Sequence, residues 1–285
     1  MSFIKNNRAA SFGVLFVIYT LAAVLGVWVY SLLDLSVWLG LLIADMAATV
    51  FVFIFSLIFS NASVYDPYWS VQPPVILAAF MAVRGAGIFG ILLLAVISLW
   101  AVRLTANWAY TFGGLSHQDW RYTMLCEKTG AFYPLINFIG IHTVPTLVVY
   151  GCTLPAVYAV VYGYEANIYS VIVLSVSLFA IALQGTADVQ MHKYRRARNS
   201  PFIRTGLWKY SRHPNYLGEI LMWWGVGASV VIAEPSAWYL LAGAVANTAL
   251  FMFVSIPLAD GRQSKKAGFE EYKRATRMLL PIKKR

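Results

Sequence analysis

The sequence predicts an all-α protein, a polytopic bundle of transmembrane helices. Of the 285 residues, 60% are hydrophobic and only 12% are charged, and the mean hydropathy is +0.66. A soluble domain of this length could not bury so much apolar surface. Of the 22 Lys and Arg residues, seven lie between Val189 and Gly218 and nine between Arg262 and Arg285. Cations gathered beside apolar segments indicate cytoplasmic loops and not a nucleic-acid surface, so no nucleic-acid partner is expected.

Apolar runs of about 20 residues, the length that crosses a bilayer, set the expected helices. The first, at 11–33, follows Lys5 and Arg8. It is too long for the core of a signal peptide and lacks a small-residue cleavage site, so we expect it to be retained. Six further runs of this kind are present, at 37–60, 86–106, 134–161, 168–187, 216–233 and 236–258.

The segment 64–84 decides whether the bundle has seven or eight helices. Three prolines interrupt it, yet its residues 75–83 are wholly apolar. If the segment crosses the membrane, there are eight helices and both termini lie on one side. If it is re-entrant, there are seven and the N-terminus lies outside. We favour eight, because Lys5 and Arg8 place the N-terminus on the same side as the basic tail under the positive-inside rule.

The same rule places the basic loop 189–214 and the tail from Arg262 in the cytoplasm. The expected protein is therefore integral to a membrane, with its C-terminus in the cytoplasm. No internal repeat, low-complexity tract or linker divides the chain, which predicts one domain over 1–285. Within it, the helices of 11–60 are expected to be accessory to a core over 61–285, and the oligomeric state is left open.

The stretch Gly206-Leu-Trp-Lys-Tyr-Ser-Arg-His-Pro-Asn-Tyr-Leu-Gly-Glu219 leads directly into an apolar segment, 220–233. Polar side chains at the mouth of a membrane helix are costly unless they bind something. The stretch ends a run from Val189 to Gly218 that has seven cations and no acid. This pattern predicts a site for a large anionic cofactor, in a cavity that opens to the cytoplasm.

Within this stretch, Pro214 suits the first turn of a helix, where its missing N–H is not needed. Helix N-termini favour anions, so phosphates are expected near His213 and beside Arg212. Glu219 then lies inside the membrane helix, where an unpaired carboxylate would cost several kcal/mol. Two alternatives stay open for Glu219: an ion pair with Arg212 or Arg103, or contact with the ligand.

Two helical stripes carry further candidates, one through Trp100, Arg103 and Asn107 and the other through Gln184, Asp188 and Arg195. Spacings of three, four and seven residues put side chains on one face of a helix. Arg103 either snorkels to the membrane interface or faces a ligand. Asp188 is either an ion-pair partner of the basic run or an acceptor for a ribose or a carboxamide.

Asp66 lies between two phenols, Tyr65 and Tyr68, next to the prolines of 64–84. Burial in an apolar setting raises the pKa of a carboxyl group, which makes Asp66 a candidate proton donor. An interfacial belt of aromatic residues around a loop aspartate explains the same pattern. Asp45, midway along its apolar run, must face the protein interior and has no assigned role. The four histidines have no paired ligand spacing, so no metal site is expected.

With Trp223 added, the Gly206–Glu219 stretch resembles the C-terminal motif of the steroid 5-alpha-reductase superfamily. From about residue 60 onward, the chain is similar to poorly characterised bacterial relatives in that superfamily, and this resemblance implies a bacterial cytoplasmic membrane. The shared segments are Tyr65-Asp-Pro-Tyr-Trp69, Arg103-Leu-Thr-Ala-Asn-Trp108, Asp119-Trp-Arg-Tyr122 and Phe269-Glu-Glu-Tyr272 with Pro281. The resemblance implies a bundle of transmembrane helices that encloses NADPH, with the cofactor entering from the cytoplasm into a region at 184–285.

The resemblance also implies cofactor contacts at Arg103, Asp188, Arg195, Tyr210, Asn215, Tyr216 and Glu219. The expected cofactor set also includes Asn107, Gln184, Arg212 and His213 from the same motifs and stripes, and Asp260 and Arg262, which lie downstream of the His-Pro motif.

The steroid-reducing members of the superfamily grip and protonate an enone with a Gln-Glu pair and a Tyr. Alignment on Arg103 without gaps puts Tyr65-Asp66 at the pair and Trp100 at the Tyr. An acid is kept, but a Trp cannot donate a proton in the same way, so steroid specificity is not implied. The expected catalytic set is Asp66, Tyr65, Tyr68 and Trp100. Arg212-His213-Pro214 is closer to sterol reductases and to the membrane methyltransferases that modify isoprenylcysteine or phospholipids.

These features favour an NADPH-dependent reductase. Its expected substrate is a conjugated carbon–carbon double bond in a lipophilic, steroid-like or isoprenoid molecule held among membrane lipids, with Asp66 aiding enol protonation. The alternative is an S-adenosylmethionine-dependent methyltransferase of a membrane lipid or an isoprenylcysteine-type acceptor. In such enzymes acids follow the His-Pro motif, where Asp260 stands here. The basic loop favours a cofactor with three phosphates over a nearly neutral one.

Overall fold

The computed structural model describes residues 2–197 and 199–283, and within those ranges the regular structure is helical, with no strand. Arg198, Lys284 and Arg285, which belong to the two basic runs, lie outside the described residues. In the described ranges, seven helical stretches are long and apolar enough to cross a membrane: Arg8–Ser31, Val37–Ile58, Ile88–Thr111, Trp120–Val161, Ile168–Ala197, Pro214–Ala233 and Pro235–Gln263. The prediction of an all-α polytopic membrane protein is confirmed.

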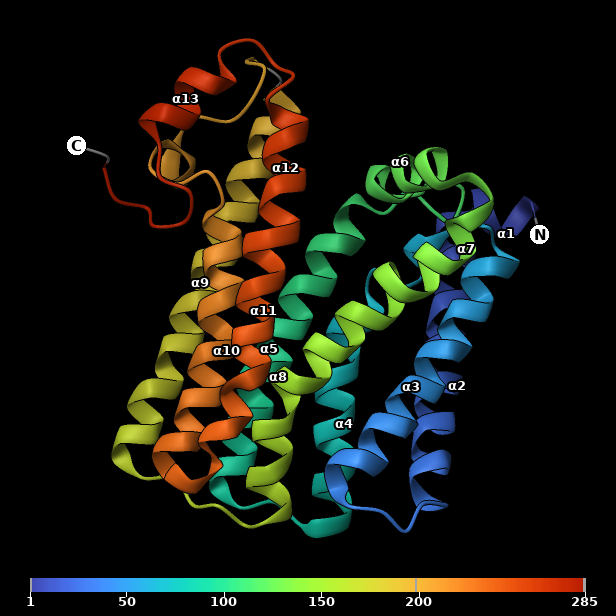
Figure 1. The fold of residues 1–285 in the computed structure, drawn as a ribbon, viewed down its shortest axis with the longest axis vertical. Helices are drawn as coiled ribbons and strands as arrows, with labels where there is room; N and C mark the ends of the chain where they lie inside the picture. Colours follow the sequence, from blue (N-terminus) through green and yellow to red (C-terminus); the bar gives the residue numbers. More distant parts are fainter. Residues whose placement is uncertain (1, 198, 284–285) are drawn as a thin grey trace.

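The helices that run up and down the bundle in Figure 1 are α2 Arg8–Ser31, α3 Val37–Ile58, α4 Tyr68–Arg84, α5 Ile88–Thr111, α8 Val144–Val161, α9 Ile168–Ala197, α10 Pro214–Ala233, α11 Ala242–Leu250 and α12 Ile256–Gln263. Short elements connect or extend them: α1 Ser2–Asn6, η1 Ala62–Val64, α6 Trp120–Thr129, η2 Gly130–Phe132, α7 Tyr133–Ile136, η3 Asn137–Thr143, η4 Gly206–Lys209, η5 Pro235–Leu241, η6 Phe251–Ser255 and α13 Phe269–Ala275.

The ambiguous segment 64–84 begins at the last residue of the short turn η1 and continues into α4, a helix of 17 residues. It is absent from the seven apolar stretches, so the count by length and composition is seven and not the favoured eight. Even so, α4 packs against α5 and α8 and returns the chain through the bundle between α3 and α5 (Figure 1). With that return pass, α1 and α13 lie at the same end of the bundle, as eight passes require.

Several helices are longer than their apolar runs. α9 was expected to end near residue 187 and instead continues to Ala197, so the first part of the expected 189–214 loop is helical. Residues 189–197 are mostly good helix formers, and Arg195 and Arg196 in the last turn complement the helix dipole. Hydropathy marks where a helix leaves the apolar layer, not where its hydrogen bonding ends.

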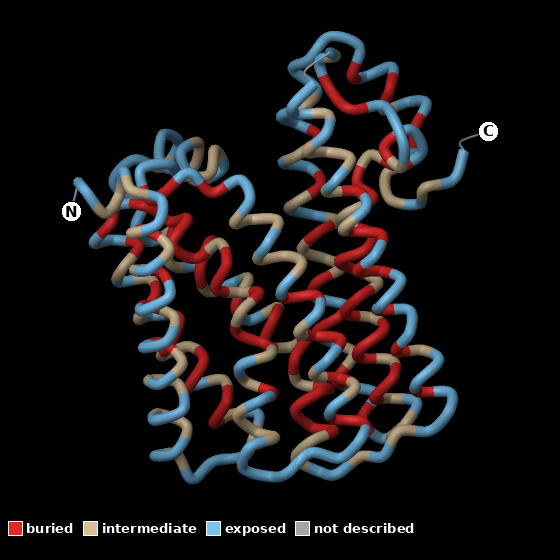
Figure 2. The backbone as a smooth tube through the Cα atoms, turned by 180° about the vertical axis from the view of Figure 1, so that it is seen from behind, coloured by how far each residue is buried: buried red, intermediate tan, exposed pale blue. Residues whose placement is uncertain are grey.

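Glycines let α9 and α10 approach closely along their length. A Cβ atom added at Gly218 would lie 2.4 Å from the Cγ atom of Gln184, and one at Gly225 would lie 2.2 Å from the Oγ atom of Ser177. Neither position therefore accepts a larger side chain without movement. Figure 2 shows the buried residues concentrated along the facing sides of the helices, and this contact brings the stripe of α9 beside that of α10.

The orientation in the membrane gives a first test. In a background with Cys126 replaced by serine, a cysteine at Glu165, in the loop between α8 and α9, should react with an impermeant maleimide on intact cells. A cysteine at Lys265, beyond α12, should react only after the cells are opened, because the positive-inside rule predicts that the basic ends lie in the cytoplasm. Labelling of Lys265→Cys on intact cells would place the basic end outside. Cys152 is buried, so it adds no background.

Candidate functional site

Glu219 is a buried carboxylate on α10 that four hydrogen bonds hold in place. The indole Nε1 of Trp100, from α5, donates to both of its oxygens at 2.9 and 3.1 Å. The indole Nε1 of Trp223, one turn further along α10, donates at 3.1 Å. The carboxamide of Gln184, from α9, donates at 3.1 Å. Three helices thus converge on one carboxylate.

Arg103 joins this carboxylate to a second one. Its Nη1 atom lies 2.8 Å from the Oδ2 atom of Asp188, and its Nη2 atom lies 3.7 Å from the Oε2 atom of Glu219. The guanidinium also donates to the carboxamide oxygen of Gln184. Of the two ion pairs that the spacing allowed for Glu219, the structure has the one with Arg103. The Nε atom of Arg103 is buried and has no hydrogen-bond partner.

A second cluster forms where α10 begins. Arg212 donates from Nε and Nη2 to the Oδ2 atom of Asp260 at 3.3 and 3.2 Å, and the Nε2 atom of His213 lies 2.9 Å from the Oδ1 atom. Arg212 also donates to the backbone oxygens of Lys273 and Thr276 at 3.2 and 2.9 Å. The cluster therefore ties the start of α10 to α12 and to the C-terminal segment.

The other expected cofactor residues lie around these two clusters. The ring of Tyr216 stacks on that of His213 with centroids 5.1 Å apart. The remaining five differ in their surroundings. Asn107 is hydrogen-bonded to His192, and the Arg262 guanidinium covers the Trp120 ring. The side-chain oxygen of Asn215 is buried and has no hydrogen-bond partner among the described residues. Arg195 and Tyr210 are exposed.

Asp66 lies in another part of the fold, between η1 and α4. The phenol of Tyr122, from α6, donates to its Oδ1 atom at 2.7 Å. Among the described residues, neither Tyr65 nor Tyr68 has a hydrogen bond to Asp66; Tyr65 pairs with Thr146 at 2.7 Å instead. Burial raises the pKa of Asp66 to about 6, although Arg121 and the Tyr122 hydrogen bond act against that rise.

The expected catalytic residues thus fall into two places. Trp100 is wholly buried in the Glu219 cluster, whereas Asp66 pairs with Tyr122, which the sequence stripes did not select. Trp69 connects the two regions, because its ring lies 5.9 Å from that of Trp100 and it belongs to the same segment as Asp66. Asp45, which had no assigned role, is buried and accepts a hydrogen bond from Gln72.

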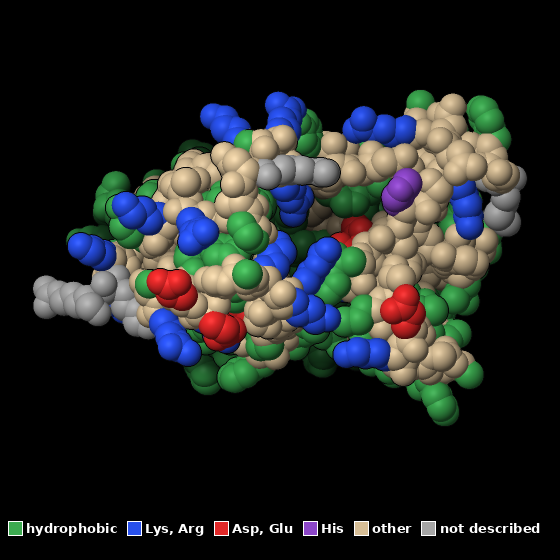
Figure 3. Space-filling view, turned by 90° about the horizontal axis from the view of Figure 1, so that it is seen from above, with side chains coloured by type: hydrophobic (Ala, Val, Ile, Leu, Met, Phe, Trp, Pro, Cys, Tyr) green, Lys and Arg blue, Asp and Glu red, His purple; other side chains and the backbone are tan. Residues whose placement is uncertain are grey.

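Seen from the end that carries α6 and α13, the molecule has a hollow between its two halves (Figure 3). Lys and Arg side chains surround this hollow, and acidic atoms are visible at its depth. Cations at the rim attract an anion, and buried carboxylates below them offer hydrogen-bond acceptors. This face therefore has the charge pattern of a site that receives an anionic molecule.

Comparison with known proteins gives family membership but no activity. The chain is 29% identical over 192 residues to the uncharacterized protein C594.04c of Schizosaccharomyces pombe, over 57% of this chain and 56% of that one. The chain thus spans little more than half the length of that relative. No solved structure matches. The family model described as "Protein of unknown function (DUF1295)" matches residues 52–276, and the chain belongs to that family.

Proposed function

We propose that this protein is an NADPH-dependent reductase of a conjugated carbon–carbon double bond in a lipophilic substrate, steroid-like or isoprenoid, within the membrane. The observation that carries the proposal is the Arg103–Gln184–Asp188–Glu219 cluster. It joins three helices by buried polar groups, close to the start of α10 and to the basic end of α9. The resemblance of the chain's motifs to the steroid 5-alpha-reductase superfamily supports the same proposed function.

The side chains present suit a dinucleotide. Two buried polar atoms near the start of α10, Arg103 Nε and Asn215 Oδ1, have no hydrogen-bond partner among the described residues, and buried polar groups without partners are costly. The Gln184 carboxamide, which Glu219 holds in place, offers a donor for the cofactor's carboxamide, and Asp188 offers an acceptor for a ribose. Exposed cations such as Arg195 are suited to phosphates. When bound, the cofactor would supply the hydride.

The chain's own residues would then handle the proton and exclude water. Asp66, held by the Tyr122 phenol, is suited to polarising a carbonyl oxygen of the substrate and to passing on a proton. Trp100 has its only polar atom bound to Glu219, so its part is to shape the pocket and to hold that carboxylate. The lipophilic body of the substrate would lie among the apolar helices, in contact with membrane lipid.

One observation favours a second candidate, an S-adenosylmethionine-dependent methyltransferase. Two carboxylates, Asp188 and Glu219, share the single guanidinium of Arg103, so the cluster carries one excess negative formal charge. A sulfonium cation is complementary to such a site. Binding of both cofactors to detergent-purified protein, measured by calorimetry, separates the candidates. Tight binding of S-adenosylmethionine without binding of NADPH would end the reductase proposal.

Exchange of one exposed arginine tests the phosphate contact. Arg195→Ala should weaken NADPH binding by more than about tenfold, since a hydrogen bond to a charged group contributes roughly 1.5–3 kcal/mol. Arg195 is exposed, so the stability of the protein should not change. Arg84→Ala, an exposed cation at the opposite end of the bundle, is the control and should bind NADPH normally. Equal affinities for the two variants would show that the basic run only orients the protein.

Arg212→Ala should behave differently. Arg212 is hydrogen-bonded to Asp260 and to two backbone oxygens of the C-terminal segment. Its loss should therefore lower the unfolding temperature as well as the affinity for NADPH. A comparison of the two arginine variants separates a contact with the cofactor from a contact that holds the site together.

A further inference from the structure

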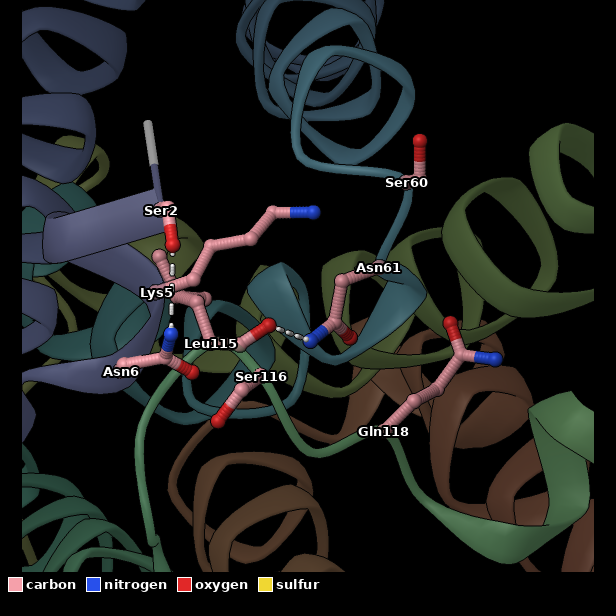
Figure 4. Close-up of a pocket in the computed structure, with 8 residues that line it drawn as sticks. All are labelled: Ser2, Lys5, Asn6, Ser60, Asn61, Leu115, Ser116 and Gln118. Atoms are coloured by element: carbon pink, nitrogen blue, oxygen red, sulfur yellow. Dashed lines mark hydrogen bonds between the residues drawn. The ribbon is translucent and has the colours of Figure 1, made fainter.

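A polar pocket of about 480 Å³ lies at the N-terminal edge of the molecule, away from the Glu219 cluster. Figure 4 shows its lining, which comes from α1, from the end of α3 and from the loop before α6. Seven of its eight lining residues are polar, none is acidic and one is a cation: Ser2, Lys5, Asn6, Ser60, Asn61, Leu115, Ser116 and Gln118. The side chains that line this pocket are therefore mostly polar, with one positive charge and no negative charge.

The pocket is built rigidly, although α1 is short. The Lys5 carbonyl oxygen accepts the backbone N–H of Ser116 at 3.0 Å, and the neighbouring Ile4 carbonyl accepts the Ser11 hydroxyl at 2.8 Å. Gly114 has a φ of +116°, and a Cβ atom there would lie 2.8 Å from the Lys5 carbonyl, so only glycine allows the loop to close on α1. These contacts fix the backbone from which the Lys5 side chain extends.

The opposite wall is fixed in the same way. The Asn61 carboxamide donates to the carbonyls of Leu115 and His117 at 2.8 and 3.0 Å. The Gln118 carboxamide oxygen accepts the Ala62 N–H at 2.9 Å. Ser60, with a φ of +48°, holds a left-handed backbone that costs free energy for a residue other than glycine. Such backbone strain persists only where the surrounding contacts hold the residue in that conformation. Here the strained residue is part of the pocket wall.

Among the residues that the structure describes, no carboxylate forms a salt bridge with Lys5. Its side chain is partly buried, and it reaches from α1 across the pocket toward the Ser60–Asn61 segment (Figure 4). The hydroxyls of Ser60 and Ser116, which can donate hydrogen bonds, line the same space. One ammonium among neutral donors is complementary to the oxygens of a phosphate group.

The position of the pocket relative to the membrane spans indicates the source of that phosphate. Its walls lie just before α2 begins at Arg8 and just after α3 ends at Ile58, at the ends of two membrane spans. Phe3, between the lining residues Ser2 and Lys5, and Phe16, on α2, are each 73% exposed and suit contact with acyl chains. Phosphates of lipid headgroups lie at this level of a bilayer.

We propose that this pocket binds the phosphate group of an anionic phospholipid and so anchors the N-terminal helices at the membrane surface. Delipidated protein would be titrated with phosphatidylglycerol or with phosphatidylcholine, and bound lipid counted by native mass spectrometry. The wild-type protein should retain more phosphatidylglycerol. Lys5→Gln should lower that retention about fivefold, the effect of one lysine near an anionic surface. Lys128→Gln, an exposed lysine on α6, is the matched control and should retain phosphatidylglycerol as the wild-type protein does.

Two further arms complete the test. Ser60→Gly removes a hydroxyl while suiting the left-handed backbone, so it keeps the fold and should also lower retention. Titration with millimolar inorganic phosphate shows whether a soluble phosphate displaces the lipid, which would assign the pocket to free phosphate compounds instead of to a headgroup. Equal retention by Lys5→Gln and Lys128→Gln, with no phosphate effect in either, would overturn the proposal.

Discussion

Replacement of Arg103 by leucine is expected to destabilise the protein by about 3–5 kcal/mol, the range for a buried ion pair that loses one partner. Arg103 is the only cation in contact with Asp188 and Glu219 in the described part of the chain, and all three side chains are largely buried. Without it, two carboxylates would face each other in an apolar bundle. The unfolding temperature in detergent, compared with that of Arg84→Leu at an exposed position, measures the loss.

A double-mutant cycle identifies the cause of that loss. Addition of Glu219→Gln to Arg103→Leu removes one of the two uncompensated charges and keeps the shape of the side chain, so part of the stability should return. Arg103→Lys keeps the charge but loses the planar fork that spans both carboxylates, and should lie between the wild-type protein and Arg103→Leu. No recovery in the double variant would mean that the loss comes from packing and not from charge.

Helical spacing predicted which side chains share a face, and the structure brings those faces together. Gln184 and Asp188 were placed on one stripe of α9, Arg103 on one stripe of α5 and Glu219 inside α10, and all four now lie in one hydrogen-bonded cluster. Spacing within a helix is a local property that a sequence states directly. It does not say which helices are neighbours, so the partner of Glu219 had two open alternatives until the packing was known.

The sequence did not predict the contacts between segments that are far apart along the chain. Tyr122, the phenol that binds Asp66, lies 56 residues away on α6, between the apolar runs 86–106 and 134–161. The two adjacent phenols were the natural choice from spacing alone. The pocket around Lys5 is a similar case, because three segments far apart in the chain form its walls. Hydropathy also underestimated α9, whose polar last turns are helical by their own hydrogen bonds.

The second large effect is expected at Asp66. Asp66→Asn should reduce NADPH-dependent turnover of a lipophilic enone by about 10²–10⁴, the range for lost general acid–base catalysis. NADPH binding should be nearly unchanged, because Asp66 has no contact with the Arg103–Glu219 cluster in the described residues. Asp34→Asn changes an exposed aspartate in the loop between α2 and α3 and is the matched control. This variant should have normal turnover.

The pH dependence gives an independent signature of the same group. Burial raises the pKa of Asp66 to about 6, so the proton is present below that pH and is lost as the pH rises through it. If Asp66 donates the proton, turnover should fall as the pH rises above about 6, and the residual activity of Asp66→Asn should not follow that fall. Tyr122→Phe removes the hydrogen bond that favours the charged form, so it should shift the midpoint of the fall to higher pH. Full turnover in Asp66→Asn would assign the donor elsewhere, with Tyr65 or Tyr68 as the next phenols to test.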